Sequence, residues 1–256
     1  MQENKGSKDP WSRFQAELDA WAETSLKATL WWRDDDAVDD TPPLRTLLTL
    51  SSETPIALAV IPEPALEGLA SCVGHRSDIS ILQHGFSHSN YAPANEKKSE
   101  YGRHRPNKEI LNEINRGYTR LQELFIQSVQ PIFVPPWNRI DDHLIPLVSE
   151  LGFCAVSAFG REKPGIELQQ INTHIDLIDW RGTRGFVGED VALIALSNQL
   201  SERRHNKNCS KKAIGLMTHH LNHDKETWRF LERLLEVTLH NSACKWMPVE
   251  TLLEQT

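Results

Sequence analysis

The chain has 256 residues, of which 39% are hydrophobic and 25% charged, as is typical of a globular protein with a substantial core. Its net charge of −7 argues against a general nucleic-acid-binding protein. No apolar run is long enough to predict a membrane span, and the polar first ten residues show no secretory signal. The spacing of the four cysteines fits neither a zinc knuckle nor a disulfide framework, so we expect reduced thiols and a cytoplasmic location.

Strands and helices are predicted to alternate along the whole chain. Helices are predicted at 11–25, 66–72, 108–128, 141–152 with a break at Pro146, 191–200, 226–239 and, as a last turn, 250–253. Strands are predicted at 28–32, 56–61, 79–82, 131–134, 153–157, 174–178, 214–217 and from 246. Residues 89–107 are polar and predict a long loop. The alternation predicts one domain over 1–256, an N-terminal helix within 1–27 and then a parallel sheet covered by helices, most simply a barrel over 28–253.

Two polar clusters follow predicted strands. Asp34, Asp35 and Asp36 come after the strand at 28–32, and His84 and His88 come after the strand at 79–82. Taken singly, the Asp triplet suits a loop or helix cap and the histidine pair suits a solvated helix face. Parallel α/β folds, however, bind ligands at the carboxyl ends of their strands. Two imidazoles and one carboxylate suit a divalent metal, and a second carboxylate can accept a proton from water, so we predict metal-assisted hydrolysis.

Two further groups of residues carry weaker predictions. A basic stretch is interpreted as a solvated loop, with a subsite for an anionic substrate group as the alternative. Its residues are Arg203, Arg204, Lys207, Lys211 and Lys212. His219, His220 and His223 suggest an additional metal site. We favour the simpler interpretation that His219 and His220 face opposite ways, because adjacent strand residues alternate.

In this order the motifs resemble those of the polysaccharide deacetylase family, the NodB-homology domain of carbohydrate esterase family 4. The Asp triplet resembles the family's Thr-Phe-Asp-Asp-Gly motif in either of two registers. The preferred register implies that Asp35 is the catalytic base and Asp36 the metal ligand; the other implies Asp34 and Asp35. His84-Gly85-Phe86-Ser87-His88 resembles His-Ser/Thr-x-x-His, which implies that both histidines are metal ligands.

The third family motif, Arg-Pro-Pro-Tyr, corresponds to Val134-Pro135-Pro136-Trp137, so the arginine that orients the base is missing. Arg33 or Arg139 could supply that charge, and we favour Arg139. Pro136 and Trp137 are placed among the substrate-binding residues.

The fourth motif, Asp-x-x-Asp-Trp, resembles the segment from Asp176 to Trp180, and the fifth, Leu-x-His, resembles Met217-Thr218-His219. The resemblance implies that Asp179 tunes His219, that His219 is the general acid and that Trp180 walls the acetyl pocket. His220 is the adjacent candidate at the pocket.

The resemblance implies a distorted (β/α)7-type barrel and a metal-dependent deacetylase that acts on an N- or O-acetylated sugar or a related small amide. It implies one divalent ion, with zinc favoured and cobalt, manganese, nickel and iron as alternatives. The expected partner is a small-molecule or oligosaccharide substrate, not nucleic acid. A hydrolase of another non-peptide C–N bond and a non-catalytic glycan-binding protein are the alternatives. The missing arginine favours the binding protein, and the retained acid and base residues favour an enzyme.

Overall fold

The computed structural model describes residues 9–74, 76–126, 128–206 and 211–254. Its strands are β1 (Ala28–Ala37), β2 (Ile56–Val60), β3 (Ile79–His84), β4 (Val129–Val134), β5 (Ala155–Val156), β6 (Gln169–Gln170), β7 (Ile175–Asp176), β8 (Ile214–Thr218) and β9 (Cys244–Trp246). Its α-helices are α1 (Pro10–Ala22), α2 (Pro42–Leu50), α3 (Glu67–Val73), α4 (Asn107–Phe125), α5 (Ile145–Glu150), α6 (Glu189–His205), α7 (Lys225–Leu239) and α8 (Val249–Leu253). Short 3-10 turns span Pro136–Asn138, Asp142–Leu144 and His220–Asn222.

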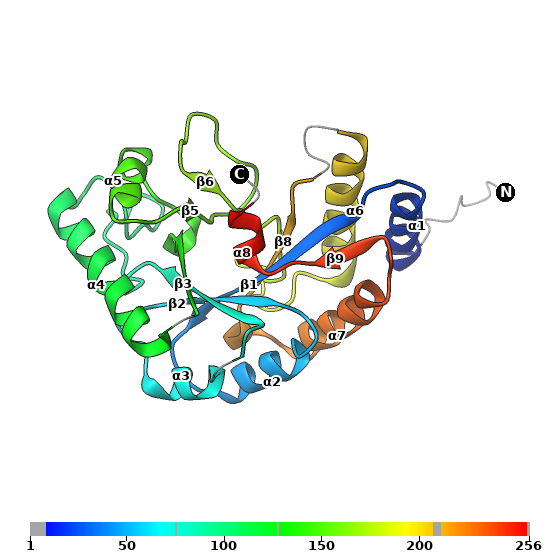
Figure 1. The fold of residues 1–256 in the computed structure, drawn as a ribbon, viewed down its shortest axis with the longest axis horizontal. Coiled ribbons are helices and arrows are strands. Elements are labelled where there is room, and N and C mark those ends of the chain that lie inside the picture. Colours follow the sequence, from blue (N-terminus) through cyan, green and yellow to red (C-terminus); the bar gives the residue numbers. More distant parts are fainter. Residues whose placement is uncertain (1–8, 75, 127, 207–210, 255–256) are drawn as a thin grey trace.

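The strands form one curled parallel sheet with helices around it, which confirms the predicted distorted barrel (Figure 1). The strand order is β6-β5-β4-β3-β2-β1-β8-β7, and β9 also pairs with β1. The central strand β1 is buried along almost its whole length, as its apolar run predicts. The two outermost strands of the path, β6 and β7, are not paired with each other in this order, so the barrel is open on that side.

Residues of β1 alternate between the inside of the barrel and the surrounding helices. Trp31 packs inside with small and branched residues of neighbouring strands, whereas Leu30 and Trp32 belong to the larger core under the helices. Because side chains alternate along a strand, Arg33 and Asp35 share the inner face with Trp31. This parity decides which charged side chains enter the barrel.

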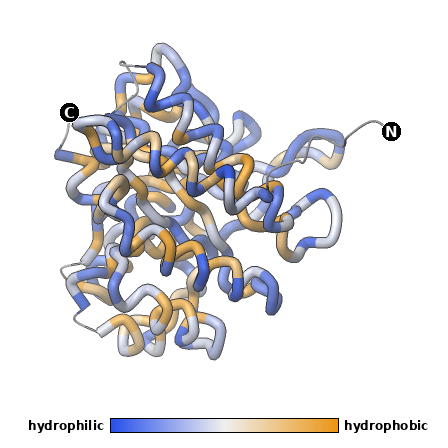
Figure 2. Tube along the Cα trace, turned by 90° about the vertical axis from the view of Figure 1, so that its right-hand side faces the viewer, coloured by the Kyte–Doolittle hydropathy of each residue, from blue (hydrophilic) through white to orange (hydrophobic). Residues whose placement is uncertain are grey.

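Helix α1 begins at a proline, and the Asp9 side chain accepts a hydrogen bond from Ser12 N–H at its start. It lies beside α6 in Figure 1, and Trp21 Nε1 donates to the carbonyl of Leu200. Figure 2 shows hydrophobic and hydrophilic stretches alternating along the outer helices, as expected for helices that bury one face. No helix in the described part of the chain is long and apolar enough to cross a bilayer.

The structure differs from the sequence predictions in several places. Helix α2 was not predicted, and β5, β6 and β7 have only two residues each. The basic stretch is not one solvated loop: Arg203 and Arg204 belong to α6, and Arg203 is buried. Lys207 lies outside the described residues. Cys72, Cys154 and Cys244 are free thiols, and Cys209 is likewise outside the described residues.

Candidate active site

Asp36, His84 and His88 form a cluster at the carboxyl edge of the sheet, here called the metal cluster. The Nε2 atom of His84 lies 3.1 Å from Asp36 Oδ1, and that of His88 lies 3.5 Å from the same oxygen. One ligand atom from each residue lies within 4.8 Å of the others. In the parts of the chain that are described, this is the one group of three or more such residues that converges in this way.

Irregular backbone conformations at Asp36 and His88 orient these side chains toward one another. The pairing of β1 with β2 is irregular between Asp35 and Ala37, and Asp36 has a φ of 72°. Such a bulge turns a side chain away from the direction that strand alternation gives it. His88 also has a positive φ, 56°. Residues held in this region cost free energy and are common at functional sites.

The turn after β3 is fitted to Gly85 and held by a buried carboxylate. Gly85 has a φ of 60°, and a Cβ there would lie 2.3 Å from Glu100 Oε2. Glu100 Oε1 accepts hydrogen bonds from the backbone N–H and the hydroxyl of Ser87. Burial raises the pKa of Glu100, although these donors oppose the shift. Glu100 therefore fixes the segment that carries His88.

The metal cluster fits a divalent cation. His84 Nδ1 donates to the Val134 carbonyl at 3.0 Å, which leaves the Nε2 lone pair directed at Asp36. Asp36 Oδ1 is buried and has no hydrogen-bond partner in the described structure. Burial by itself would raise the pKa of Asp36, but His84, His219 and His88 together lower it. A buried, ionised oxygen beside two imidazole nitrogens is a donor set that suits zinc and its neighbours.

Asp35 is held by Arg33 from its own strand. Arg33 Nε and Nη2 donate to the two carboxylate oxygens at 2.7 and 2.9 Å. Its Nη1 donates to the carbonyl and hydroxyl of Ser157, and Nη2 also donates to Asn138 Oδ1. The arginine is completely buried. The preference for Arg139 is therefore corrected: its side chain is exposed and donates to the carbonyl of Lys98, because the loop after β4 turns it outward.

Asp34 points away from the metal cluster, toward the helices. Its oxygens accept from the Thr218 hydroxyl at 2.6 Å and the His220 backbone N–H at 3.0 Å, and Oδ1 lies 2.5 Å from His220 Nδ1. Burial would raise the pKa of Asp34, but the His220 ring lowers it; Asp34 in turn raises the pKa of His220 against the effect of burial. Both residues are buried. The structure thus places His220 in a structural pair instead of at the pocket, and His219 faces the other way.

His219 faces the metal cluster from the end of β8. Its Nε2 lies 3.9 Å from Asp35 Oδ2, and its ring meets the Trp180 ring edge to face at 4.7 Å. Trp180 is 42% exposed, so it forms a wall that is open to solvent.

Within the fourth motif, the carboxylate whose charge interacts with His219 is Asp176, in addition to Asp35 and Asp36 from β1. Asp176 Oδ2 accepts from Trp180 Nε1 at 2.9 Å, and its charge interacts with His219. Burial raises the pKa of Asp176, although His219 and the hydrogen bonds to Asp176 oppose the shift. Asp179 instead accepts from the backbone N–H of Gly182 at 3.0 Å, and a Cβ on Gly182 would lie 2.2 Å from Asp179 Oδ2. Asp179 therefore stabilises the tight turn after β7, and its role in tuning His219 stays a prediction.

Trp137 and Pro136 lie beside the metal cluster. The Trp137 and His88 rings are 4.4 Å apart, and Trp137 has a φ of 54°. Pro136 is buried, and its ring occupies the space that a Cβ on Gly85 would need. Trp137 therefore lies against a histidine of the metal cluster, whereas Pro136 supports the turn that carries His88.

Sequence reasoning missed Asp176 and Glu100 and named Arg33 only as the second choice. Asp176 lies in the quoted fourth motif, so the signal was present, but the family pattern assigned the role to Asp179. Arg33 was named, and strand alternation placed it on the side of Asp35. Glu100 gave no local signal, because its role depends on the path of the long loop.

No family model and no curated protein matches the chain. Comparison with solved structures, by contrast, identifies proteins with the same fold. A putative polysaccharide deacetylase from Mycobacterium smegmatis superposes with a TM-score of 0.60 and 16% identity over 91% of each chain. The Bc1960 peptidoglycan N-acetylglucosamine deacetylase gives 0.56 and 15%, with 91% of this chain and 90% of that chain covered.

A family 4 carbohydrate esterase from Streptomyces lividans, in complex with acetate, gives a TM-score of 0.55 and 13% identity over 87% of this chain and 93% of that chain. All three similarities extend over most of both chains. The resemblance read from the motifs is therefore confirmed for the architecture: this chain has the fold of the polysaccharide deacetylases of carbohydrate esterase family 4.

Proposed function

We propose that the protein is a metal-dependent deacetylase that removes an acetyl group from an N- or O-acetylated sugar. The observation that carries the proposal is the position of Asp35 and His219 next to the metal cluster, 3.9 Å apart between Oδ2 and Nε2. A carboxylate and an imidazole at one metal-binding edge are the base and the acid that hydrolysis of an amide or ester needs.

Asp36, His84 and His88 are the residues that would hold the ion. A bound divalent ion supplies Lewis acidity and lowers the pKa of water from 15.7 to about 7 in favourable sites. Zinc is the ion we favour.

The side chains of this chain supply the proton transfers. Asp35 accepts the proton of the attacking water, and Arg33 holds both of its oxygens in place. His219 gives a proton to the leaving amine or alcohol. Trp180 packs against the His219 ring and Trp137 against the His88 ring, so their flat faces can bind the acetyl methyl and the sugar ring.

The presence of Arg33 weakens the case for a non-catalytic binding protein. That alternative depended on the missing arginine of the third motif, and the structure supplies a guanidinium to Asp35 from β1. A glycan-binding protein has no need for a buried ion pair that orients a base.

The test is acetate release from acetylated chito- and xylo-oligosaccharides, measured with metal content on the same preparations. Asp35→Asn should abolish turnover and keep about one equivalent of metal, because a carboxamide cannot accept the proton. Asp36→Asn should lose metal, since a ligand oxygen loses its charge.

Arg139→Met is the matched control and should keep activity. If metal-loaded wild-type protein releases no acetate but cleaves another amide, the alternative of a hydrolase for another non-peptide C–N bond is supported. Metal-loaded protein that binds these glycans without any turnover would refute the enzyme.

A further inference from the structure

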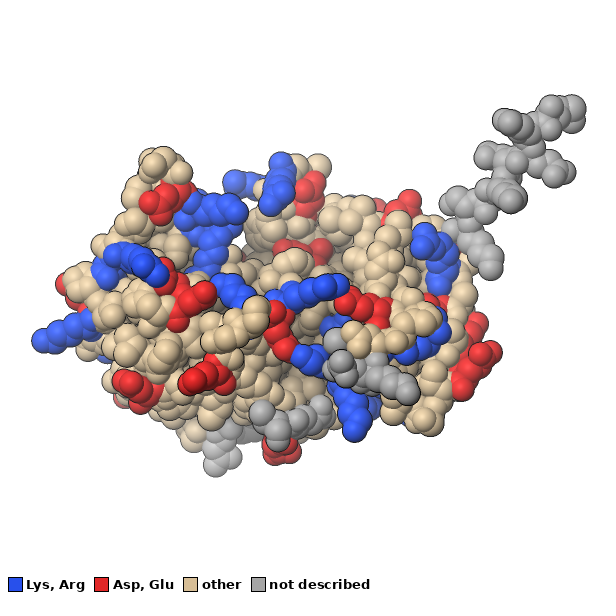
Figure 3. All heavy atoms as spheres, turned by 90° about the horizontal axis from the view of Figure 1, so that it is seen from above, with Lys and Arg blue, Asp and Glu red and all other residues tan. Residues whose placement is uncertain are grey.

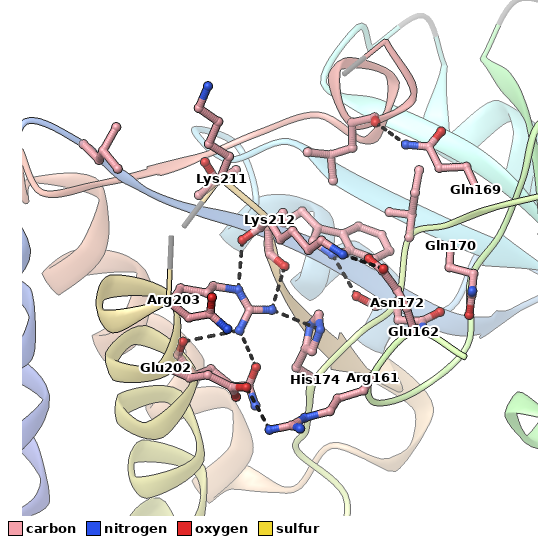
Figure 4. Close-up of a pocket in the computed structure, with 18 of the residues that line it drawn as sticks. Arg161, Glu162, Gln169, Gln170, Asn172, His174, Glu202, Arg203, Lys211 and Lys212 are labelled. Carbon is pink, nitrogen blue, oxygen red and sulfur yellow. Dashed lines mark hydrogen bonds and ion pairs between the residues drawn. The ribbon is translucent and has the colours of Figure 1, made fainter. Parts of the chain in front are cut away.

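A second hollow lies at the opposite end of the barrel from the metal cluster. This amino-end cavity has a volume of about 1180 Å³. Its lining includes Lys27 and Trp31 on or beside the first half of β1 and Lys245 on β9. His174 just before β7 and Lys211 just before β8 also line it (Figure 4). Parallel strands start at this edge, so the cavity and the metal cluster are separated by the length of the sheet. It lies on the side where β6 and β7 leave the barrel open.

The charge of the lining is opposite to that of the protein. The cationic lining residues are Lys27, Arg161, Arg203, Lys211, Lys212 and Lys245, and the acidic ones are Glu162, Glu167 and Glu202. The chain as a whole carries a net charge of −7. Figure 3 views the molecule from above and shows Lys and Arg side chains on this face with Asp and Glu side chains among them. A concave basic region in an acidic protein concentrates positive potential.

Part of this charge is neutralised within the lining. Lys212 Nζ lies 2.5 Å from Glu162 Oε2, and Arg161 Nη2 lies 2.8 Å from Glu202 Oε1. The ammonium groups of Lys27, Lys211 and Lys245, by contrast, make no ion pair with any described carboxylate. Three cations around one hollow thus keep their charge available.

Arg203 makes the wall of the cavity rigid. Its guanidinium donates to the carbonyls of Lys212 and Ala213 and lies 3.1 Å from His174 Nε2. Gly215 N–H donates to the other ring nitrogen of His174. Burial and the Arg203 charge lower the pKa of His174 to about 3. The wall therefore consists of a buried fixed cation and a neutral imidazole, and it adds positive charge without a titrating group.

We propose that the amino-end cavity binds a compact, multiply charged anion of the phosphate type, carried by a small organic molecule. Lysine ammonium groups act as point charges that suit phosphate oxygens, and three lysines that make no ion pair with a described carboxylate are among the residues that line this hollow. Leu26 also lines the cavity and is 41% exposed, so it gives an apolar surface for the organic part. The cavity is as large as the binding sites of drug-sized ligands.

The test is calorimetric titration of the protein with fructose 1,6-bisphosphate, with inorganic phosphate as a second arm. We expect saturable binding that weakens as salt rises and is at least about tenfold weaker in Lys27→Gln/Lys211→Gln/Lys245→Gln. The matched control Lys108→Gln/Lys225→Gln removes two exposed lysines from other faces and should bind like the wild type.

His84→Ala alters the metal cluster and leaves the amino-end cavity intact. Bisphosphate binding should therefore be unchanged in this variant. If inorganic phosphate binds as tightly as the bisphosphate, the anion site is supported, but the proposal that the cavity also binds the organic part of the ligand is refuted. No saturable binding, an equal loss in the control, or loss in His84→Ala would overturn the proposal.

Discussion

Replacing Arg33 by methionine tests the arrangement of the base most directly. The arginine is fully buried and the Asp35 side chain is 3% exposed, so water cannot take over the lost contacts. Methionine fills similar space but leaves Asp35 charged and without its two guanidinium bonds. Removing one partner of a buried ion pair typically costs about 3–5 kcal/mol. We expect this loss in the free energy of unfolding by urea, and a fall in kcat of about one to three orders of magnitude.

A double-variant cycle identifies the cause of that loss. Asp35→Asn removes the charge that Arg33→Met leaves behind, so the double variant should be more stable than the sum of the single losses by at least about 1 kcal/mol. Arg139→Met is the control for a general loss of positive charge, and it should change stability by no more than about 0.5 kcal/mol. If Arg33→Met loses less than about 1 kcal/mol, or the two changes are additive, the ion pair does not hold Asp35 as described.

Three more outcomes are expected. Asp176→Asn should lower kcat and shift the pH profile of kcat/KM, because it removes a charge beside the general acid, whereas Asp179→Asn should alter stability more than the profile; the reverse would restore the motif-based assignment. Asp34→Asn should lower the free energy of unfolding by about 3–5 kcal/mol with metal content unchanged, since it leaves His220 buried beside a neutral partner; loss of metal instead would favour the other register. The native pKa of His174, about 3, lies below its unfolded value, so its stabilising effect is complete above about pH 6.5 and is lost as pH falls. His174→Asn should therefore reduce the loss of unfolding free energy between pH 6 and pH 4 by about 2 kcal/mol, and equal losses in both proteins would contradict this.

The sequence predicted the barrel well because its strongest signals are local. The apolar run at 28–32 and the helical spacing at 108–128 depend on short windows. The helix matches α4 closely, whereas β1 continues to Ala37 and so includes the Asp triplet that was expected to follow it. Helix α2 was missed because it begins with two prolines after Thr41, which resemble a turn, although Thr41 caps the helix by accepting from Leu44 N–H. Strands were predicted at 153–157 and 174–178, where β5 and β7 lie, but β6 was missed because two residues are too few to show an alternating pattern.

Side-chain positions in the candidate site were predictable where they follow from alternation along one strand. They were not predictable where they depend on the conformation of a turn. The alternation along β1 places Arg33 and Asp35 together, and the spacing of His84 and His88 brings them to one edge. The choice between Asp176 and Asp179 depends on the tight turn at Gly182, which the motif does not reveal. The outward path of Arg139 likewise depends on the positive φ of Trp137 and Asn138 just before it.

The position of Arg33 two residues before Asp35 has a consequence for how this site can vary. A base and the cation that orients it usually have to be kept in register by two separate segments, and any change in one must be matched in the other. Here a single strand encodes both, so the pair is inherited and engineered as one unit. The loop after β4 no longer has to supply that cation. Asn138 still has to accept a hydrogen bond from Arg33, whereas the exposed Arg139 can vary with the proton-accepting centre left intact.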